Sequence, residues 1–258
     1  KVMGLKAQLT KAKLEPKLHL IKYKKNCLTA ENKETLGLLR SVIVYNDEII
    51  SFAPPKSLDF DKYIERTDVN MPNNAVEEFV EGTMINMFFN KLTQDWEIAS
   101  RSNIGARCCF YQDKKITFRT MFLEAMNKLG YEFKDFEKKY CYSWILQHPD
   151  NRIVVPFTQP NLVLCRIYEC KNLTVKEIPN PIPCAGNIRP PYTLYTWSTE
   201  GKPNISVHVT SSCIGFLPEF SNILDFKNIN HLKDAIESGS YKYTLMGLVF
   251  RDPKTGIR

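Results

Sequence analysis

Short apolar runs separated by turn residues constrain the fold of this chain more than any other feature. From about residue 37, the run Leu38–Tyr45 is followed by an Asn-Asp turn and then by the run Ile49–Phe52. The same arrangement recurs downstream, where Thr83–Phe89 and Trp96–Ser100 flank a polar turn. Each pair is typical of an antiparallel hairpin. Two such hairpins predict a core built mainly from antiparallel β-sheet.

Helices and further strands complete this prediction. Over Thr117–Leu129 the apolar side chains recur at helical spacing before Gly130, which predicts an α-helix that ends at a glycine. A second strand pair is predicted at Tyr142–Gln147 and Arg152–Phe157, and a further strand at Asn161–Cys170. Strands with a few interspersed helices predict an α+β fold, with an antiparallel β-sheet core and flanking helices.

The last third of the chain is less regular. Five prolines within residues 179–191 predict an extended, irregular connection. Beyond it, His231–Ser238 is predicted to form a short helix and Thr244–Phe250 a strand. We therefore divide the chain into residues 1–35, a basic N-terminal segment, and residues 36–258, a single domain.

The formal net charge of +7 is concentrated at the start of the chain, because residues 1–25 carry eight lysines against the single Glu15. A lysine-rich segment can approach phosphate groups or an acidic protein surface through charge alone. The N-terminal segment is therefore a candidate docking site for a protein partner or for RNA. The alternative is a solvated amphipathic helix or a frayed arm that binds nothing.

The eight cysteines show no Cys-x-x-Cys pair and no regular spacing. This pattern predicts reduced, mostly buried thiols in an intracellular, reducing compartment, and it predicts no metal site among them. No apolar run reaches the ~18 residues that a membrane-spanning helix needs, so we expect no membrane partner.

Three short motifs lie at the ends of predicted strands: Phe79-Val80-Glu81-Gly82, Arg101-Ser102, and Asn151-Arg152-Ile153-Val154. Taken in order, they resemble motifs of the ATP-dependent RNA ligases of the phage tRNA-repair type, members of the covalent nucleotidyltransferase superfamily. The resemblance covers residues 36–170 well and 240–258 weakly. It implies an ATP-grasp-like nucleotidyltransferase domain of the RNA/DNA ligase type. The chain is most similar to uncharacterised RNA-ligase-like proteins of large DNA viruses, which implies a viral protein of the host cytoplasm or the virion.

Two basic residues match phosphate contacts of that family. Arg40 stands where the family has an arginine that contacts nucleotide phosphates, and Lys56 stands where a lysine touches the outer phosphates of ATP. A planar guanidinium and a flexible ammonium together suit a triphosphate. The resemblance thus implies ATP and Mg²⁺ as cofactors. It assigns nucleotide or phosphate binding to Arg40, Lys56, Glu81, Arg101 and Arg152.

Three positions that carry chemistry in the family hold apolar residues here. Phe79 stands in place of the lysine that attacks ATP and carries AMP. Ile145 and Met246 stand in place of two acidic residues near the ribose or the metal. Loss of the nucleophile together with two carboxylates removes covalent and metal chemistry alike. The last family motif, a lysine-bearing strand, is expected directly after Arg258.

Several of the matched residues also have plainer interpretations. Glu81 could pair with Arg101 across the hairpin, and Arg152 could fix the fold through carbonyl or carboxylate partners. Lys56 could be an ordinary surface lysine. Because it follows two prolines, Lys56 could instead act as a displaced nucleophile, if burial lowers its pKa.

The leading hypothesis from the sequence is a catalytically degenerate RNA-ligase-like nucleotidyltransferase fold that binds a nucleotide, an RNA end or a protein partner. One alternative is an active ATP-dependent RNA ligase with a displaced lysine nucleophile. Another is a structural virion or assembly protein whose basic N-terminal segment docks an acidic partner.

Overall fold

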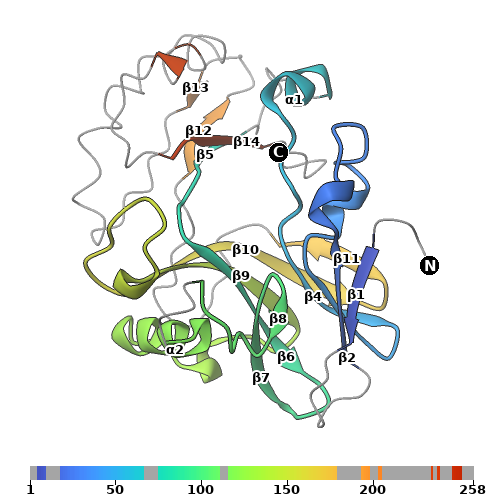
Figure 1. The fold of residues 1–258 in the computed structure, drawn as a ribbon, viewed down its shortest axis with the longest axis vertical. Coiled ribbons are helices and arrows are strands. Elements are labelled where there is room, and N and C mark those ends of the chain that lie inside the picture. Colours follow the sequence, from blue (N-terminus) through green and yellow to red (C-terminus); the bar gives the residue numbers. More distant parts are fainter. Residues whose placement is uncertain are drawn as a thin grey trace. The chain divides into compact units, whose positions relative to one another are not determined.

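The computed structural model of the chain describes residues 5–9, 18–66, 75–110, 116–178, 193–197, 203–204, 234, 237–238 and 246–251. The chain divides into two compact units (Figure 1). The first comprises residues 1–56 and 81–190, and the second comprises residues 57–80 and 191–258. Among the described residues, no helix is both long enough and apolar enough to cross a membrane.

Two antiparallel sheets form the first unit. One has the strand order β1-β2-β3-β4, with β1 at Leu5–Leu9, β2 at Leu18–Tyr23, β3 at Val42–Tyr45 and β4 at Glu48–Phe52. The other has the order β11-β10-β9-β6-β7-β8, with β6 at Thr83–Asn90, β7 at Asp95–Ser100, β8 at Asn103–Ile104, β9 at Tyr140–Gln147, β10 at Asn161–Lys171 and β11 at Thr174–Glu177. Short 3-10 helices connect them: η1 (Lys25–Cys27), η2 (Leu36–Leu38), η3 (Phe133–Asp135) and η4 (Pro149–Asn151).

Both predicted hairpins are present, so the expectation of a mainly antiparallel core is confirmed. Asn46 and Asp47 join β3 to β4 with φ angles of 46° and 64°, the left-handed values of a tight two-residue hairpin turn. β6 and β7 pair up to Asn90, which lies opposite Asp95.

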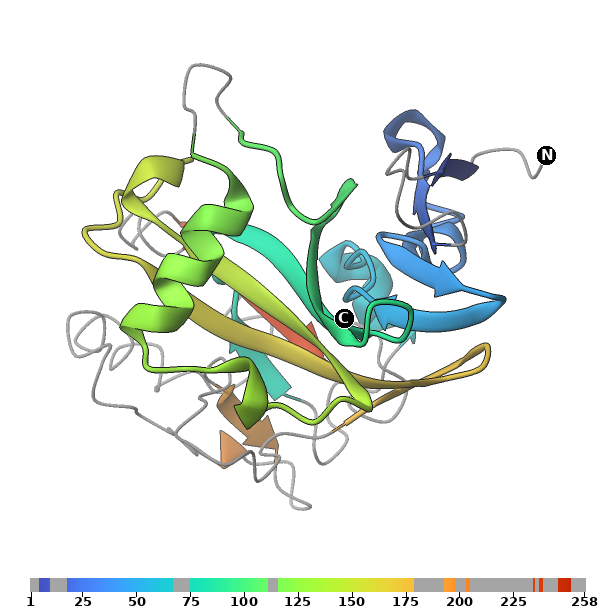
Figure 2. The same cartoon turned by 90° about the horizontal axis from the view of Figure 1, so that it is seen from below.

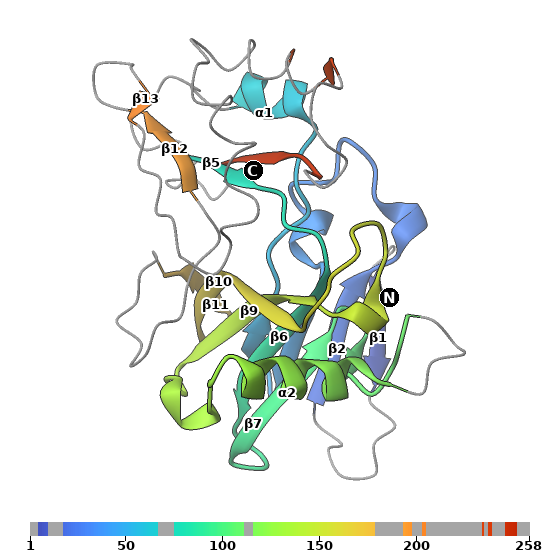
Figure 3. The same cartoon turned by 90° about the vertical axis from the view of Figure 1, so that its left-hand side faces the viewer.

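The helix predicted over residues 117–129 is α2, Phe118–Lys128. The Thr117 side chain caps it by accepting a hydrogen bond from the Thr120 backbone N–H at 3.2 Å. Gly130, with a φ of 72°, follows the end of the helix. Figures 2 and 3 show α2 lying along one face of the six-stranded sheet. The buried side chains of the helix are Phe118, Met121, Phe122, Ala125 and Met126, and they pack on Ile85, Met87, Tyr142, Trp144 and Leu146.

The opposite face of the six-stranded sheet packs against the four-stranded sheet. Their shared core consists of Leu18, Leu20, Ile43 and Ile50 from the four-stranded sheet and Phe88, Ala99, Cys141 and Tyr168 from the six-stranded one. The central strands β6 and β9 are therefore buried on both faces. Such strands tolerate few polar side chains without partners.

The structure corrects two predictions. Residues 152–157, predicted as a strand, form an irregular loop after η4. In the basic N-terminal segment, residues 5–9 and 18–23 are strands, not a helix or a frayed arm. The reason is the alternation at Leu18-His19-Leu20, which buries Leu18 and Leu20 in the core while β2 pairs with β3.

Other predictions are tested only in part. The six cysteines within the described ranges form no disulfide, and only Cys141 is buried, so the prediction of mostly buried thiols is not met in these ranges. The connection at 179–191 and most of the predicted helix His231–Ser238 lie outside the described residues. So do the first residues of the predicted strand Thr244–Phe250, whose later part is β14.

The second unit contains a four-stranded antiparallel sheet and one helix. The sheet has the order β13-β12-β5-β14, with β5 at Ala75–Glu78, β12 at Thr193–Trp197, β13 at Pro203–Asn204 and β14 at Leu248–Arg251. The helix α1 spans Phe60–Arg66. Its Phe60 and Tyr63 rings lie 5.2 and 6.1 Å from the ring of Phe250, so aromatic contacts join α1 to β14.

Glu81 fixes the loop that follows η4. Its side chain is 8% exposed; Oε1 accepts the Val154 backbone N–H at 2.7 Å, and Oε2 accepts the Val155 backbone N–H at 2.8 Å. Its own carbonyl oxygen accepts a hydrogen bond from Gln147 Nε2 at 3.0 Å. Because two consecutive N–H groups of the loop bond to a side chain, they are not free for a strand ladder. This explains why the loop replaces the predicted strand.

Gly82 lies where the backbone before β6 passes close to β9. Its φ is 142°, and a Cβ atom there would lie 2.5 Å from both Ile145 Cγ2 and the Leu146 carbonyl oxygen. A contact this short to a backbone oxygen cannot be relieved by turning a side chain. Glycine is therefore required at this position for steric and conformational reasons.

We predict that Gly82→Ala destabilises the protein by about 3 kcal/mol or more, because an overpacking clash adds to the cost of the backbone conformation. The matched control is Gly130→Ala. Gly130 also has a positive φ, but a Cβ there would meet nothing within 4 Å. The control should therefore lose only about 1–2 kcal/mol. Urea unfolding measures both, and equal losses would contradict the steric argument.

A second prediction concerns Glu81→Gln, which should lower the free energy of unfolding by about 1–3 kcal/mol, since an amide leaves one buried backbone N–H without an acceptor. The matched control is Glu48→Gln, which removes an exposed ion pair with Lys91. Such a surface pair contributes about 0–1 kcal/mol. If thermal unfolding shows the two variants to be equally stable, Glu81 does not hold the loop.

Candidate anion-binding site

Backbone pairing brings Arg40 next to Tyr23. The Tyr23 backbone N–H, at the end of β2, donates a hydrogen bond to the carbonyl oxygen of Leu39 at 2.8 Å. Leu39 directly precedes Arg40. The Tyr23 side chain is only 5% exposed, so its ring is held by the surrounding core.

Arg101 follows β7 and lies over the same ring. Its Cζ atom is 4.7 Å from the centroid of Tyr23, which is a cation–π contact. The Nε atom of Arg101 is buried and has no hydrogen-bond partner among the described residues. A buried N–H without an acceptor costs about 1–3 kcal/mol. The Nε–H group of Arg101 therefore has no acceptor in the described part of the protein.

Arg40 carries a second positive charge on a half-buried side chain. Burial lowers the pKa of its guanidinium; Tyr23 opposes this, and the positive charge of Arg101 lowers the pKa further. Arginine nevertheless stays protonated at neutral pH. Within the described ranges, no carboxylate lies within ion-pair distance of Arg40 or Arg101. We call these three residues the Arg40–Tyr23–Arg101 cluster.

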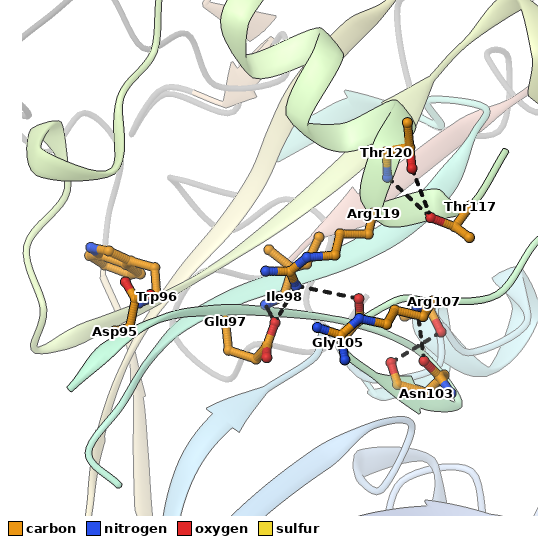
Figure 4. Close-up of polar contacts among 11 residues, drawn as sticks. Asp95, Trp96, Glu97, Ile98, Asn103, Gly105, Arg107, Thr117, Arg119 and Thr120 are labelled. Atoms are coloured by element: carbon orange, nitrogen blue, oxygen red, sulfur yellow. Dashed lines mark hydrogen bonds and ion pairs between the residues drawn. The ribbon is translucent and has the colours of Figure 1, made fainter. Parts of the chain in front are cut away.

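Hydrogen bonds hold the segment that follows Arg101 (Figure 4). Arg119, in the first turn of α2, donates from Nη1 to Glu97 Oε1 at 2.5 Å and to the Gly105 carbonyl oxygen at 3.4 Å. The Gly105 backbone N–H donates to the Ile98 carbonyl oxygen at 2.7 Å. These bonds tie the turn to both β7 and α2, so the position of Arg101 is fixed by the core.

Lys22 adds a third positive charge near the cluster. Its Nζ atom donates a hydrogen bond to Ser102 Oγ at 2.6 Å, which places the ammonium beside the residue after Arg101. Lys22 also directly precedes Tyr23 in β2.

Lys56 lies near Arg40 through the backbone. Its N–H donates to the Gly37 carbonyl oxygen at 3.0 Å, and Gly37 belongs to η2, just before Arg40. The Lys56 side chain is exposed. Burial, on which the displaced-nucleophile hypothesis depends, is therefore missing in this structure.

Glu81 and Arg152 lie elsewhere, at the loop after η4. The suggested pairing of Glu81 with Arg101 is wrong, because both oxygens of Glu81 accept backbone N–H groups of Val154 and Val155. Arg152 is exposed, and its Nε atom donates to the Val154 carbonyl oxygen at 3.3 Å. Both side chains thus contact the same loop. Of the five predicted binding residues, the structure brings Arg40, Lys56 and Arg101 to one neighbourhood and these two to another.

The three apolar replacements lie next to backbone of the matched motifs. In the second unit, the Phe79 N–H donates to the Gly247 carbonyl oxygen at 2.9 Å, so Phe79 pairs with the residue that follows Met246. In the first unit, Ile145 contacts the backbone at Gly82. Phe79 is 49% exposed and Met246 is 37% exposed. None of the three side chains can act as a nucleophile or hold a cation.

The Mg²⁺ implied by the resemblance does not fit the residues present. Mg²⁺ takes oxygen ligands, mainly carboxylates and phosphates. Ile145 and Met246 offer no oxygen in their side chains, and both carboxylate oxygens of Glu81 are engaged. In the part of the chain that the structure describes, no three His, Cys, Asp or Glu side chains could together hold a metal ion.

The sequence alone did not indicate Tyr23 or Lys22 as site residues. Both were counted only as part of a basic N-terminal segment. The alternation of Leu18 and Leu20 predicts a strand here, but Tyr23 is out of step with it, so this pattern could not have placed the Tyr23 side chain. Its pairing with Leu39 and its contact with Arg101 join distant parts of the sequence, and no local pattern encodes them.

Part of the chain is similar in sequence to a known ligase. No family model matches the chain. Among curated proteins, an RNA ligase of Rhodothermus phage RM378 is 28% identical over 102 residues, which are 36% of this chain and 22% of that protein. This match supports the resemblance to RNA ligases for about a third of the chain.

Two solved structures are similar at lower identity. A putative ATP-dependent DNA ligase from Aquifex aeolicus aligns with a TM-score of 0.46 and 14% identity, covering 77% of this chain and 50% of that one. An archaeal ATP-dependent RNA ligase, form 1, aligns with a TM-score of 0.39 and 14% identity, covering 68% of this chain and 42% of that one. The chain thus spans half or less of the proteins to which it is similar.

Proposed function

We propose that this chain is a catalytically degenerate relative of the RNA ligases. It keeps the nucleotidyltransferase fold, and it binds the phosphate group of a nucleotide or of an RNA end at the Arg40–Tyr23–Arg101 cluster. The observation that carries the proposal is the charge of this cluster. The Arg101 guanidinium lies over the buried Tyr23 ring, the Arg40 guanidinium is close enough to both to feel them electrostatically, and no described carboxylate pairs with either arginine.

Charge of this kind is costly to bury unless an anion binds. A buried, unpaired cation destabilises the folded state, and a like charge beside it adds to that cost. Arginine matches phosphate well because its planar fork donates two parallel hydrogen bonds to two oxygens. A phosphate would offset both charges and supply the acceptor that Arg101 Nε lacks.

Degeneracy rests on the replaced positions. A phenylalanine at position 79 cannot form a bond to the α-phosphorus of ATP, and Ile145 and Met246 cannot coordinate a cation. The partial similarity to a phage RNA ligase supports the ligase ancestry. We therefore infer a binding protein that recognises phosphorylated ends without adenylating itself.

Arg40→Gln provides the first test in thermal unfolding. Without ligand, the variant should melt a few degrees above wild type, because relief of about 1 kcal/mol corresponds to roughly 2–4 °C in a chain of this size. With ATP, GTP or a 5′-phosphorylated RNA present at about 100 times Kd, wild type should gain about 2.7 kcal/mol. The variant should gain little or nothing.

The matched control is Arg107→Gln, which removes an exposed arginine from the segment that follows Arg101. It should keep the wild-type melting temperature and the wild-type response to ligand. If wild type shows no shift at millimolar concentrations of all three ligands, phosphate binding is refuted. If Arg107→Gln loses the response as fully as Arg40→Gln, general charge rather than the cluster is responsible.

Incubation with ATP and Mg²⁺ tests the loss of catalysis. Intact mass spectrometry should show no lysine-linked AMP, since the position of the nucleophile holds Phe79. An adduct would overturn degeneracy. Its mapping to Lys56 by peptide sequencing, and its loss in Lys56→Arg, would establish the displaced-nucleophile alternative.

A further inference from the structure

Arg40 and Arg101 carry hydrogen-bond donors that lack protein acceptors. Neither side chain donates a hydrogen bond to any residue within the described ranges, and the buried Nε of Arg101 is among the unpartnered atoms. The face of Arg101 is held against Tyr23 at 4.7 Å, so its orientation is set before a ligand arrives. Fixed donors without acceptors form a preorganised anion site.

The described residues of the same unit offer no set of ligands for a divalent cation. Both oxygens of Glu81 bond to the loop backbone, and Ile145 is apolar. No group of three potential metal ligands exists among the residues that the structure describes. A phosphate bound by this chain would therefore contact arginine side chains directly, whereas in a metal-dependent site it would contact a bound metal ion.

We propose that the Arg40–Tyr23–Arg101 cluster takes a terminal phosphate group directly, with no divalent cation between the phosphate and the protein, so that Mg²⁺ competes with the protein for the ligand. This inference rests on the proposed function and adds the nature of the recognised group and its metal dependence. Mg²⁺ neutralises phosphate charge and occupies the oxygens that the arginines would bind.

The charge balance favours a terminal phosphate over an internal one. A terminal phosphate carries close to two negative charges at neutral pH, whereas an internal phosphodiester carries one. Two guanidinium groups are therefore neutralised by one terminal phosphate.

Tyr23 is the positioning residue of the cluster. Its ring lies under the Arg101 guanidinium and its backbone holds the residue before Arg40. Tyr23→Phe keeps the ring and should bind phosphate as wild type does. Tyr23→Leu leaves both arginine charges in place but removes the stacking surface, and it should weaken binding by about threefold to tenfold. A purely electrostatic site would not distinguish these two variants.

Isothermal titration with ATP tests the metal dependence. The dissociation constant is measured in EDTA and in excess Mg²⁺, with ionic strength matched by NaCl so that general screening is equal. We expect binding to be weaker in Mg²⁺ by about threefold or more, because two of the ligand charges are neutralised. Equal or tighter binding in Mg²⁺ would overturn the proposal of direct recognition.

Two RNA probes separate the possible sources of the phosphate. In EDTA, a short RNA with a 5′-phosphate and the same RNA with a 5′-hydroxyl are titrated into wild type and Arg101→Gln. A preference of about tenfold for the 5′-phosphate that vanishes in the variant identifies a terminal phosphate as the ligand group. Equal affinity for both RNAs, with ATP still bound, restricts the site to nucleotides and refutes RNA-end recognition. Absence of binding by ATP and by RNA in both buffers refutes the proposed function itself.

Discussion

Burial of β6 and β9 on both faces is the constraint on which the first unit depends. α2 covers one face through Phe122 and its neighbours, and the four-stranded sheet covers the other through Leu18, Ile43 and Phe88. Strands enclosed in this way need an unusual backbone conformation or additional hydrogen bonds where they enter and leave the core. At the entry to β6, Gly82 permits a close approach to β9, and Glu81 secures the adjoining loop. The polar groups of the unit are consequently concentrated where its strands end.

The cluster lies at such strand ends. Its two positive charges lower the stability of the fold, and the proposed binding of an anion would offset that cost. Tyr23 ends β2, Arg101 follows β7, and Arg40 immediately precedes Ser41 and β3. The aromatic ring and the hydrogen-bonded turn after Arg101 maintain a geometry that repulsion between the two arginines opposes. Protein cores keep uncompensated charge of this kind mainly at functional sites, where a ligand restores the balance.

The sequence predicted elements that depend on neighbouring residues, and it missed contacts between residues far apart in the chain. The hairpin at Asn46-Asp47 and the helix that begins after Thr117 are encoded by neighbouring residues, and both are present. Residues 152–157 do not form the expected strand, because Glu81, which is distant in sequence, accepts hydrogen bonds from the backbone N–H groups of Val154 and Val155. Arg40 and Arg101 were predicted from motifs. Tyr23, whose ring lies under Arg101 and whose backbone bonds to the residue before Arg40, was not predicted, because contacts over such separations leave no local periodicity.

The motif around residue 79 divides into parts that the fold needs and parts that only chemistry needs. Gly82 is required because any Cβ there would approach backbone to 2.5 Å, and Glu81 is required by two buried N–H groups. These are the residues that the chain retains. Phe79, by contrast, is 49% exposed, and its contact with Gly247 in the second unit is made by its backbone N–H. A side chain with so few packing constraints can change from lysine without cost to the fold, whereas Gly82 cannot. Folding alone therefore accounts for Glu81 and Gly82, and the proposed binding rests on the arginines of the cluster instead.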